Sequence, residues 1–187
     1  RGALSPSTPL FRSPFTKLDV LHRENLVELL ADYDIKGLSE AEIDHLNTAW
    51  HRLPPWPDSV PGLLRLKTKF IIGTQSNGNI ALMVNMAKNG GLPWDVILGS
   101  EVVQAYKPQP EAYLRACEAL ALAPEQVLMT AAHNNDLAAA KAQGMSTAFV
   151  ARPLEFGTRS PKMDVEPGPH VDISAWSFTE LAEKLGC

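Results

Sequence analysis

The sequence predicts an α/β protein, with a doubly wound parallel sheet and a smaller helical unit in front of it. From Val60 onward, short apolar runs alternate with helical patterns, which is typical of parallel strands joined by crossover helices. Before Pro54, apolar residues recur only with the helical period. The chain of 187 residues, with 45% hydrophobic and 20% charged residues, is long enough for one sizeable core and an appended lobe.

The front of the chain is predicted to be helical after an irregular lead-in. Residues 1–16 are rich in proline and serine, which favours irregular structure. Leucines then recur on one helical stripe and predict a helix from about Lys17 to Tyr33. Ser39 and Glu42 have the spacing of a capping box, in which each side chain bonds the backbone amide of the other residue. This pair predicts the start of a second helix.

Prolines mark a predicted domain boundary. The segment 53–58 contains Pro54, Pro55 and Pro57, and proline lacks a backbone donor and restricts the residue before it. We therefore expect a helical unit over residues 1–57 and an α/β core over residues 58–187.

The core is predicted to alternate between strands and helices. The expected strands are the short apolar runs at residues 70–73, 96–98, 127–129, 148–150 and 171–173. The expected helices cover residues 60–67, 80–90, 110–120 and 136–143, with one more after Ser177. Gly144 is expected to end its helix in the left-handed conformation, and Ser177 with Glu180 forms a second capping-box pattern.

Composition excludes several classes of function. The net charge of −4 provides no electrostatic footprint for nucleic acid. No apolar run approaches the length of a membrane span, and the first residues do not have the pattern of a signal segment. Cys117 and Cys187 do not form a disulfide framework, so reduced thiols in a cytoplasmic protein are expected.

Polar residues lie where the predicted strands end. Ser76 and Asn77 occupy a strand-to-helix turn, Lys107 lies between Tyr106 and Pro108, and Asp136 begins a helix. Because the carboxyl ends of parallel strands meet in one crevice, these side chains are expected to converge.

Each of these residues also has an ordinary structural interpretation. Ser76 and Asn77 are common turn and N-cap residues, but with the helix-start amides they could bind an anion. Lys107 could be a solvated charge, but prolines around it favour a fixed ammonium that neutralises a carboxylate. Asp136 could complement the helix dipole, or it could pair with Lys107.

Two further residues precede Asp136. His133 and Asn134 could be loop residues without a role, or they could contact a substrate.

Taken in order, these segments resemble the second, third and fourth motifs of the haloacid dehalogenase-like superfamily. The chain is most similar to its type II (L-2-haloacid) dehalogenases. The resembling segments are Lys17–Arg23, Trp50–Asp58, Ser76–Asn79, Tyr106–Pro110 and Ala131–Leu137. This resemblance implies a Rossmann-like core, a helical cap over residues 1–57 and hydrolysis of carbon–halogen bonds in short 2-haloacids.

The resemblance also implies roles for residues. In the family, an aspartate after the first core strand attacks the carbon that bears the halogen and forms an ester, which water cleaves. Ser76, with Asn77, would bind the substrate carboxylate, Lys107 would organise the nucleophile, and Asp136 would hold that lysine and position water. The family implies no cofactor, and a homodimer would be unsurprising in it.

A magnesium-dependent phosphatase is the enzyme-class alternative. Superfamily phosphatases usually carry a second acid four residues before the position of Asp136, but Ala132 stands there and cannot ligate a metal. Ala132 and His133 thus favour a metal-free dehalogenase. Better-known dehalogenases have asparagine where His133 stands, which affects substrate choice more than reaction class.

The first motif is not found in this sequence. Asp19, Asp32 and Asp34 lie in or beside helical patterns, and none follows an apolar strand. We expect the nucleophile strand, and a cap arginine that cradles the halide, to lie in an upstream segment, and the chain without it to be inactive. A truncated, non-catalytic fragment that only binds small carboxylates is therefore a third alternative.

Overall fold

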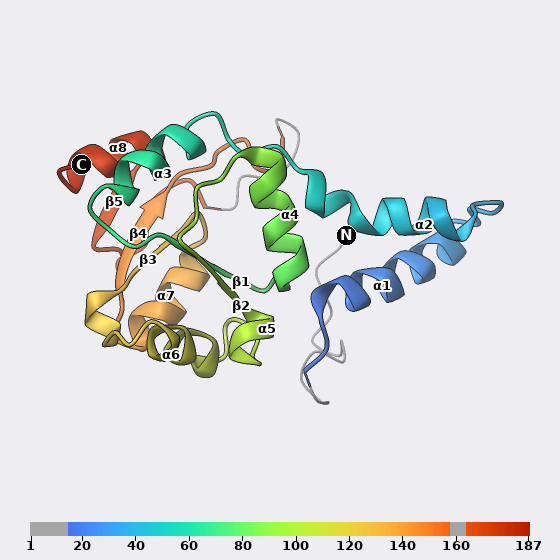
Figure 1. Ribbon diagram of the computed structural model, residues 1–187, viewed down its shortest axis with the longest axis horizontal. Coiled ribbons are helices and arrows are strands. Elements are labelled where there is room, and N and C mark those ends of the chain that lie inside the picture. The colour runs from blue at the N-terminus through green and yellow to red at the C-terminus, as the bar shows by residue number, and fades with distance from the viewer. Residues whose placement is uncertain (1–14, 158–163) are drawn as a thin grey trace.

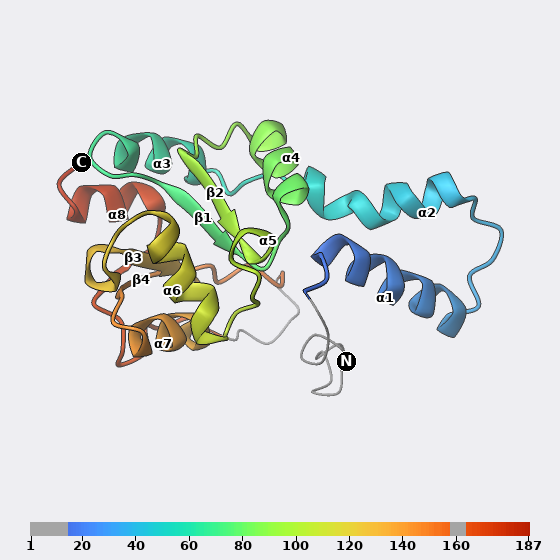
Figure 2. The ribbon, with the colours of Figure 1, turned by 60° about the horizontal axis from the view of Figure 1, so that its bottom comes forward.

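The computed structural model describes residues 15–157 and 164–187, so most of the lead-in predicted over residues 1–16 lies outside the described residues. A helical hairpin comes first and projects away from the rest of the molecule (Figures 1 and 2). It consists of α1 (Leu18–Asp32), α2 (Glu40–Asn47) and the 3₁₀ helix η2 (Thr48–Arg52). Neither α1 nor α2 contains a buried residue.

The capping box predicted at Ser39 and Glu42 is confirmed. The Ser39 hydroxyl accepts from the Glu42 amide at 3.3 Å, and the Glu42 carboxylate accepts from the Ser39 amide at 2.8 Å. The pair at Ser177 is only half formed: Ser177 accepts from the Glu180 amide at 3.1 Å, but Glu180 bonds the amide of Trp176. The prediction of a second capping box was therefore wrong for one of its two bonds, the one from the Ser177 amide to the Glu180 carboxylate.

The strands are parallel, as predicted, and form two sheets. Strands β1 (Gly73–Ser76) and β2 (Val96–Gly99) make one sheet. The second sheet contains β3 (Leu128–Ala131), β4 (Ser146–Val150) and β5 (Ile173–Ala175), in that order. Within the described ranges, β1 and β3 are not paired with each other, and each has one neighbour.

Helices cover the strands on both sides. Figure 1 shows α3 (Ser59–Lys67) and α8 (Phe178–Lys184) on one side, and α6 (Pro110–Ala119) and α7 (Asn134–Ala142) on the other. The remaining elements of the core are α4 (Ile80–Gly90), α5 (Ser100–Val103) and η3 (Pro124–Gln126). No helix within the described residues is both long and apolar enough to cross a membrane.

One hydrophobic cluster lies on each side of the sheets. Leu63, Leu66 and Leu181 pack with Ala148 and Val150 beneath α3 and α8. On the other side, the buried residues come mainly from α6, α7 and the strands, and include Tyr113, Cys117, Met129, Leu137 and Phe149.

The first strand was predicted too early in the chain. The apolar run at residues 70–73 is mostly exposed, with 40% of Phe70 and 65% of Ile71 accessible, and β1 occupies Gly73–Ser76 instead. The polar residue Thr74 is accommodated in this strand because its hydroxyl donates to the Leu98 carbonyl at 2.6 Å. Ser76 therefore ends a strand. The last strand is likewise later than the predicted 171–173, and α7 begins at Asn134, two residues earlier than predicted.

Candidate active site

Asp136 joins two helices and a loop through its carboxylate. Its Oδ2 lies 2.5 Å from the Lys107 ammonium, and both side chains are largely buried. Its Oδ1 accepts a hydrogen bond of 2.7 Å from the Tyr113 hydroxyl. The ion pair predicted between Lys107 and Asp136 is thus present. With both oxygens engaged, the carboxylate has a fixed orientation.

The sequence did not single out Tyr113. Its position on α6, beside Ala112 and one turn before Ala116 and Cys117, marks the buried face of the helix, and the side chain is fully buried. Burial, and then the bond to the Asp136 carboxylate, raise the pKa of the Tyr113 phenol above its ordinary value. The phenol therefore stays protonated and acts as a donor. The role of Tyr113 as a donor to Asp136 is visible only from the contact between its hydroxyl and the Asp136 carboxylate.

Asn77 fixes the backbone at Lys107. Its Oδ1 accepts from the Lys107 amide at 2.7 Å, and its Nδ2 donates to the Lys107 carbonyl at 3.3 Å. The following peptide bond, between Lys107 and Pro108, is cis. Asn77 was predicted to contact the substrate; its amide group is engaged with Lys107, so it links the β1 end to the lysine segment.

Ser76 lies at the carboxyl end of β1, next to Asn77. Its hydroxyl oxygen accepts from the Gly78 amide at 3.0 Å. Gly99 allows the close approach of this turn, because a Cβ there would lie 2.8 Å from the carbonyl oxygens of Ser76 and Gly78. Among the described residues, the Ser76 hydroxyl donates to no acceptor, so its proton is available to an incoming anion.

His133 and Asn134 are directed elsewhere. The His133 Nε2 lies 2.9 Å from the Glu155 carboxylate in a pair that is substantially exposed. Asn134 bonds the Asp164 carboxylate, the Glu166 carbonyl and the Gly168 amide, and so holds residues 164–168. Their predicted contact with a substrate stays a prediction.

The structure therefore connects Ser76, Asn77, Lys107 and Asp136, and adds Tyr113. Such a site offers one hydroxyl donor and one buried ammonium, which suits a small carboxylate. Within the two described ranges, no group of three or more His, Cys, Asp or Glu side chains is arranged to hold a metal ion.

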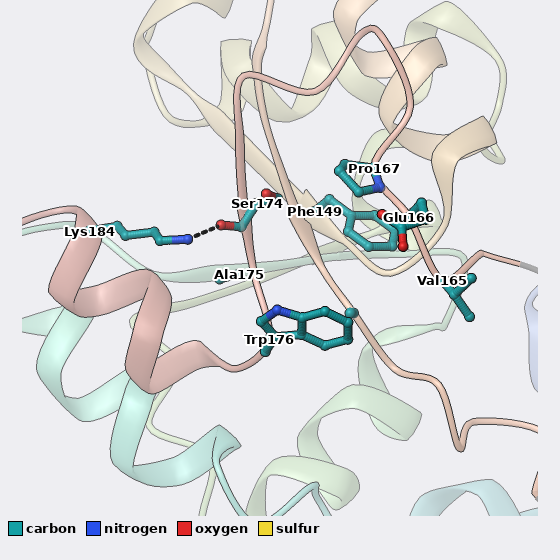
Figure 3. Close-up of a pocket in the computed structure, with 9 residues that line it drawn as sticks. Phe149, Val165, Glu166, Pro167, Ser174, Ala175, Trp176 and Lys184 are labelled. Carbon is teal, nitrogen blue, oxygen red and sulfur yellow. Dashed lines mark hydrogen bonds between the residues drawn. The ribbon is translucent and has the colours of Figure 1, made fainter.

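A separate cavity of about 180 Å³ lies beside β4 and β5. Figure 3 shows Trp176 and Phe149 with Val165 and Pro167 around it, while Lys184 donates to the Ser174 carbonyl at 2.7 Å. None of the predicted site residues lines this cavity.

Comparisons with known proteins find haloacid dehalogenases and, over half of the chain, phosphoglycolate phosphatases. A family model described as haloacid dehalogenase-like hydrolase matches residues 12–144. The (S)-2-haloacid dehalogenase 4A of Burkholderia cepacia is 31% identical over 122 residues, which is 64% of this chain and 51% of that protein. The chain thus spans about half the length of this curated relative.

Two solved structures share the fold over most of the chain. The L-2-haloacid dehalogenase PA0810 is 41% identical with a TM-score of 0.90, over 94% of this chain and 77% of that one. The defluorinating L-2-haloacid dehalogenase Rha0230 is 49% identical with a TM-score of 0.90, over 94% and 72%.

Proposed function

The chain belongs to the haloacid dehalogenase-like hydrolases, in the L-2-haloacid dehalogenase family, and from this premise we propose that its full-length gene product hydrolyses short 2-haloalkanoic acids. The observation that carries the proposal is the largely buried ion pair of Lys107 and Asp136, joined through Asn77 to the β1 end that bears Ser76. A fixed ammonium and a free hydroxyl donor on two segments that Asn77 links fit a substrate with a single carboxylate.

The reaction proceeds through an ester on an aspartate. A carboxylate oxygen of that aspartate attacks carbon 2 of the substrate, and the halide leaves with the bonding electron pair. Water then adds to the ester carbonyl, which releases the 2-hydroxy acid and restores the carboxylate. Ser76 binds the substrate carboxylate, Lys107 orients the nucleophile, and Asp136 holds Lys107 and positions the water.

The nucleophile belongs to a strand between β1 and β3 in this proposal. Two features support it. Both β1 and β3 have only one paired neighbour among the described residues, although unpaired backbone groups in a sheet interior are costly. The Gln75 side chain on β1 also has a buried Oε1 without a partner there. In the same proposal, residues 1–57 contribute to the cap and residues 58–187 to the core.

Metal independence is part of the proposal. Ala132 lacks a carboxylate, and both oxygens of Asp136 are bonded to Lys107 and Tyr113. A magnesium ion would have to displace one of these partners to reach Asp136.

The alternatives remain a magnesium-dependent phosphatase of the same superfamily and a fragment that binds carboxylates without turnover. A homodimer is proposed as the assembly.

A halide-release assay on the full-length gene product tests the function. The substrates are both enantiomers of 2-chloropropionate and, because one relative is described as defluorinating, fluoroacetate. Halide release from the S enantiomer that persists with a chelator supports the proposal. Phosphate release that a chelator abolishes, without halide release, would establish the phosphatase instead. Carboxylate binding without either product would favour the non-catalytic alternative.

A further inference from the structure

The segment before and at the start of α1 contacts both the Ser76 turn and the Lys107 segment of the candidate site. We call residues 15–19 the strap segment. At its front, the Phe15 ring stacks on Tyr106 with a centroid distance of 5.3 Å. The Tyr106 hydroxyl donates to the Thr16 carbonyl. Because Tyr106 precedes Lys107, this contact reaches the lysine segment directly.

The strap also reaches the first amide of α4. Lys17 lies 2.7 Å from Glu101, and the same Glu101 side chain accepts from the Ile80 amide at 2.8 Å. Lys17 is more than half exposed, so this ion pair alone contributes little stability. The ion pair matters because Glu101 also bonds the first residue of α4, the helix that begins just after the turn of Ser76 and Asn77.

Asp19 and Asn79 form the central contact. Asn79 Nδ2 donates to Asp19 Oδ2 at 2.8 Å, and Asn79 Oδ1 accepts from the Asp19 amide at 3.3 Å. Only 2% of Asn79 is exposed. Asn79 is the N-cap residue of α4, yet its side chain makes no cap hydrogen bond and points across to α1 instead. A buried N-cap asparagine that forgoes its usual bond indicates that the contact with Asp19 has been favoured over local helix capping.

His51 completes the contact without being a catalytic base. Its Nε2 lies 3.0 Å from Asp19 Oδ1, which by itself resembles an Asp–His dyad. The other ring nitrogen, Nδ1, is occupied by Asn85 Nδ2 at 2.9 Å, and only 7% of His51 is exposed. With Asn85 as donor, the proton lies on Nε2 and is donated to Asp19. No ring nitrogen is left for a substrate, so His51 orients Asp19.

We propose that the strap segment couples the position of the α1–α2 hairpin to the site, with Asp19 and Asn79 as its positioning residues. Movement of α1 pulls on Asn79, which lies three residues after Ser76, and on Tyr106, which precedes Lys107. The consequence for catalysis rests on the proposed dehalogenase function; the mechanical coupling does not.

A side-chain exchange between the two positions tests the coupling. Asn79→Asp places two carboxylates against each other, and Asp19→Asn presents an amide donor either to His51 or to Asn79. The double variant Asp19→Asn/Asn79→Asp restores a carboxamide–carboxylate pair, in which the new Asn accepts from His51 and donates to the new Asp. Glu28→Gln is the matched control, because it removes an exposed carboxylate of α1 for which the described residues show no bond.

Hydrogen exchange measured by mass spectrometry on the full-length protein tests the coupling without depending on enzymatic activity. Each single variant should speed exchange on the order of tenfold at the starts of both α1 and α4, and the double variant should return both segments toward wild type. For 2-chloropropionate, each single variant should raise KM more than it lowers kcat, with recovery of KM in the double variant.

The outcomes separate the two proposals. Exchange that changes only in α1, or a double variant no better than the worse single variant, would overturn the coupling. So would single variants that lower stability but leave KM at the wild-type value in an active enzyme. Absence of halide release from the wild type, together with coupled exchange, would overturn the dehalogenase function and leave the coupling supported.

Discussion

The phenolic oxygen of Tyr113 lies 2.7 Å from Oδ1 of Asp136, on the carboxylate oxygen that does not contact the lysine. Asp136 is therefore held from α6 and from the Lys107 segment at the same time. The opposite charges of Lys107 and Asp136 alone would allow several geometries, but a two-point contact of the carboxylate allows few.

Removal of either member of the ion pair should abolish most of the activity. Lys107→Ala and Asp136→Ala are each expected to lower kcat for 2-chloropropionate by on the order of 10² or more, because each removes or releases the charge that orients the nucleophile. Chloride release from the full-length protein measures this, with Lys88→Ala on the exposed end of α4 as the control. Near-normal rates in either variant would remove that residue from the site.

Tyr113→Phe should change how stability depends on pH. Near neutral pH it should lower the free energy of unfolding by about 1–3 kcal/mol, because a buried oxygen of Asp136 loses its donor. Above pH 10.0, the ordinary pKa of tyrosine, the unfolded chain loses this proton while the folded protein keeps it. Wild-type stability should then fall more steeply than that of the variant, by about 1.4 kcal/mol per pH unit.

Urea unfolding of both proteins between pH 8 and about 11.5 measures the difference. Other groups that titrate in this range cancel in the comparison. A constant difference between wild type and Tyr113→Phe across the whole range would contradict the raised pKa of Tyr113.

His133→Asn should alter substrate preference and leave the reaction class unchanged. His133 lies on the surface with Glu155, and an exposed pair of this kind contributes at most about 1 kcal/mol of stability. We expect the ratio of kcat/KM values for chloroacetate and 2-chlorobutyrate to change, with a melting temperature near that of the wild type. An unchanged ratio would show that His133 has no part in substrate selection.

Gly62→Ala should destabilise the contact between α3 and α8. A Cβ at this position would lie 2.4 Å from the Phe178 Cβ and 2.5 Å from the Phe178 carbonyl carbon, so the two helices would have to separate. The expected loss is about 1–3 kcal/mol in the free energy of unfolding. Leu64→Ala on the same helix, where 52% of the leucine is exposed, should cost less and provides the control.

Strand β1 does not coincide with the apolar run that precedes it. Phe70 and Ile71 have the composition of a strand, but they are exposed, and the strand consists of Gly73, Thr74, Gln75 and Ser76. Thr74 and Gln75 are tolerated because they donate to the carbonyls of Leu98 and Ala112. Such long-range bonds leave no pattern in the local sequence. The local sequence therefore predicts the strand at the apolar run 70–73 and not at Gly73–Ser76.

Asn134 is a second case. It was predicted as a loop residue with a possible substrate contact, but it is the first residue of α7 and its side chain holds residues 164–168. Its partners lie about 30 positions later in the chain, and nothing in the local sequence identifies them.

The sequence by itself determined the class of fold, the α/β alternation and the segments that bear Ser76, Lys107 and Asp136, because these depend on local periodicity and on residue type at the ends of strands. Tertiary structure decided which atoms meet. It placed Tyr113 on Asp136, directed the Asn77 amide to the Lys107 backbone, and turned Asn79 away from its own helix toward Asp19. Hydrogen bonds between distant residues depend on the packing of whole helices, and packing is a property of the folded chain rather than of any segment.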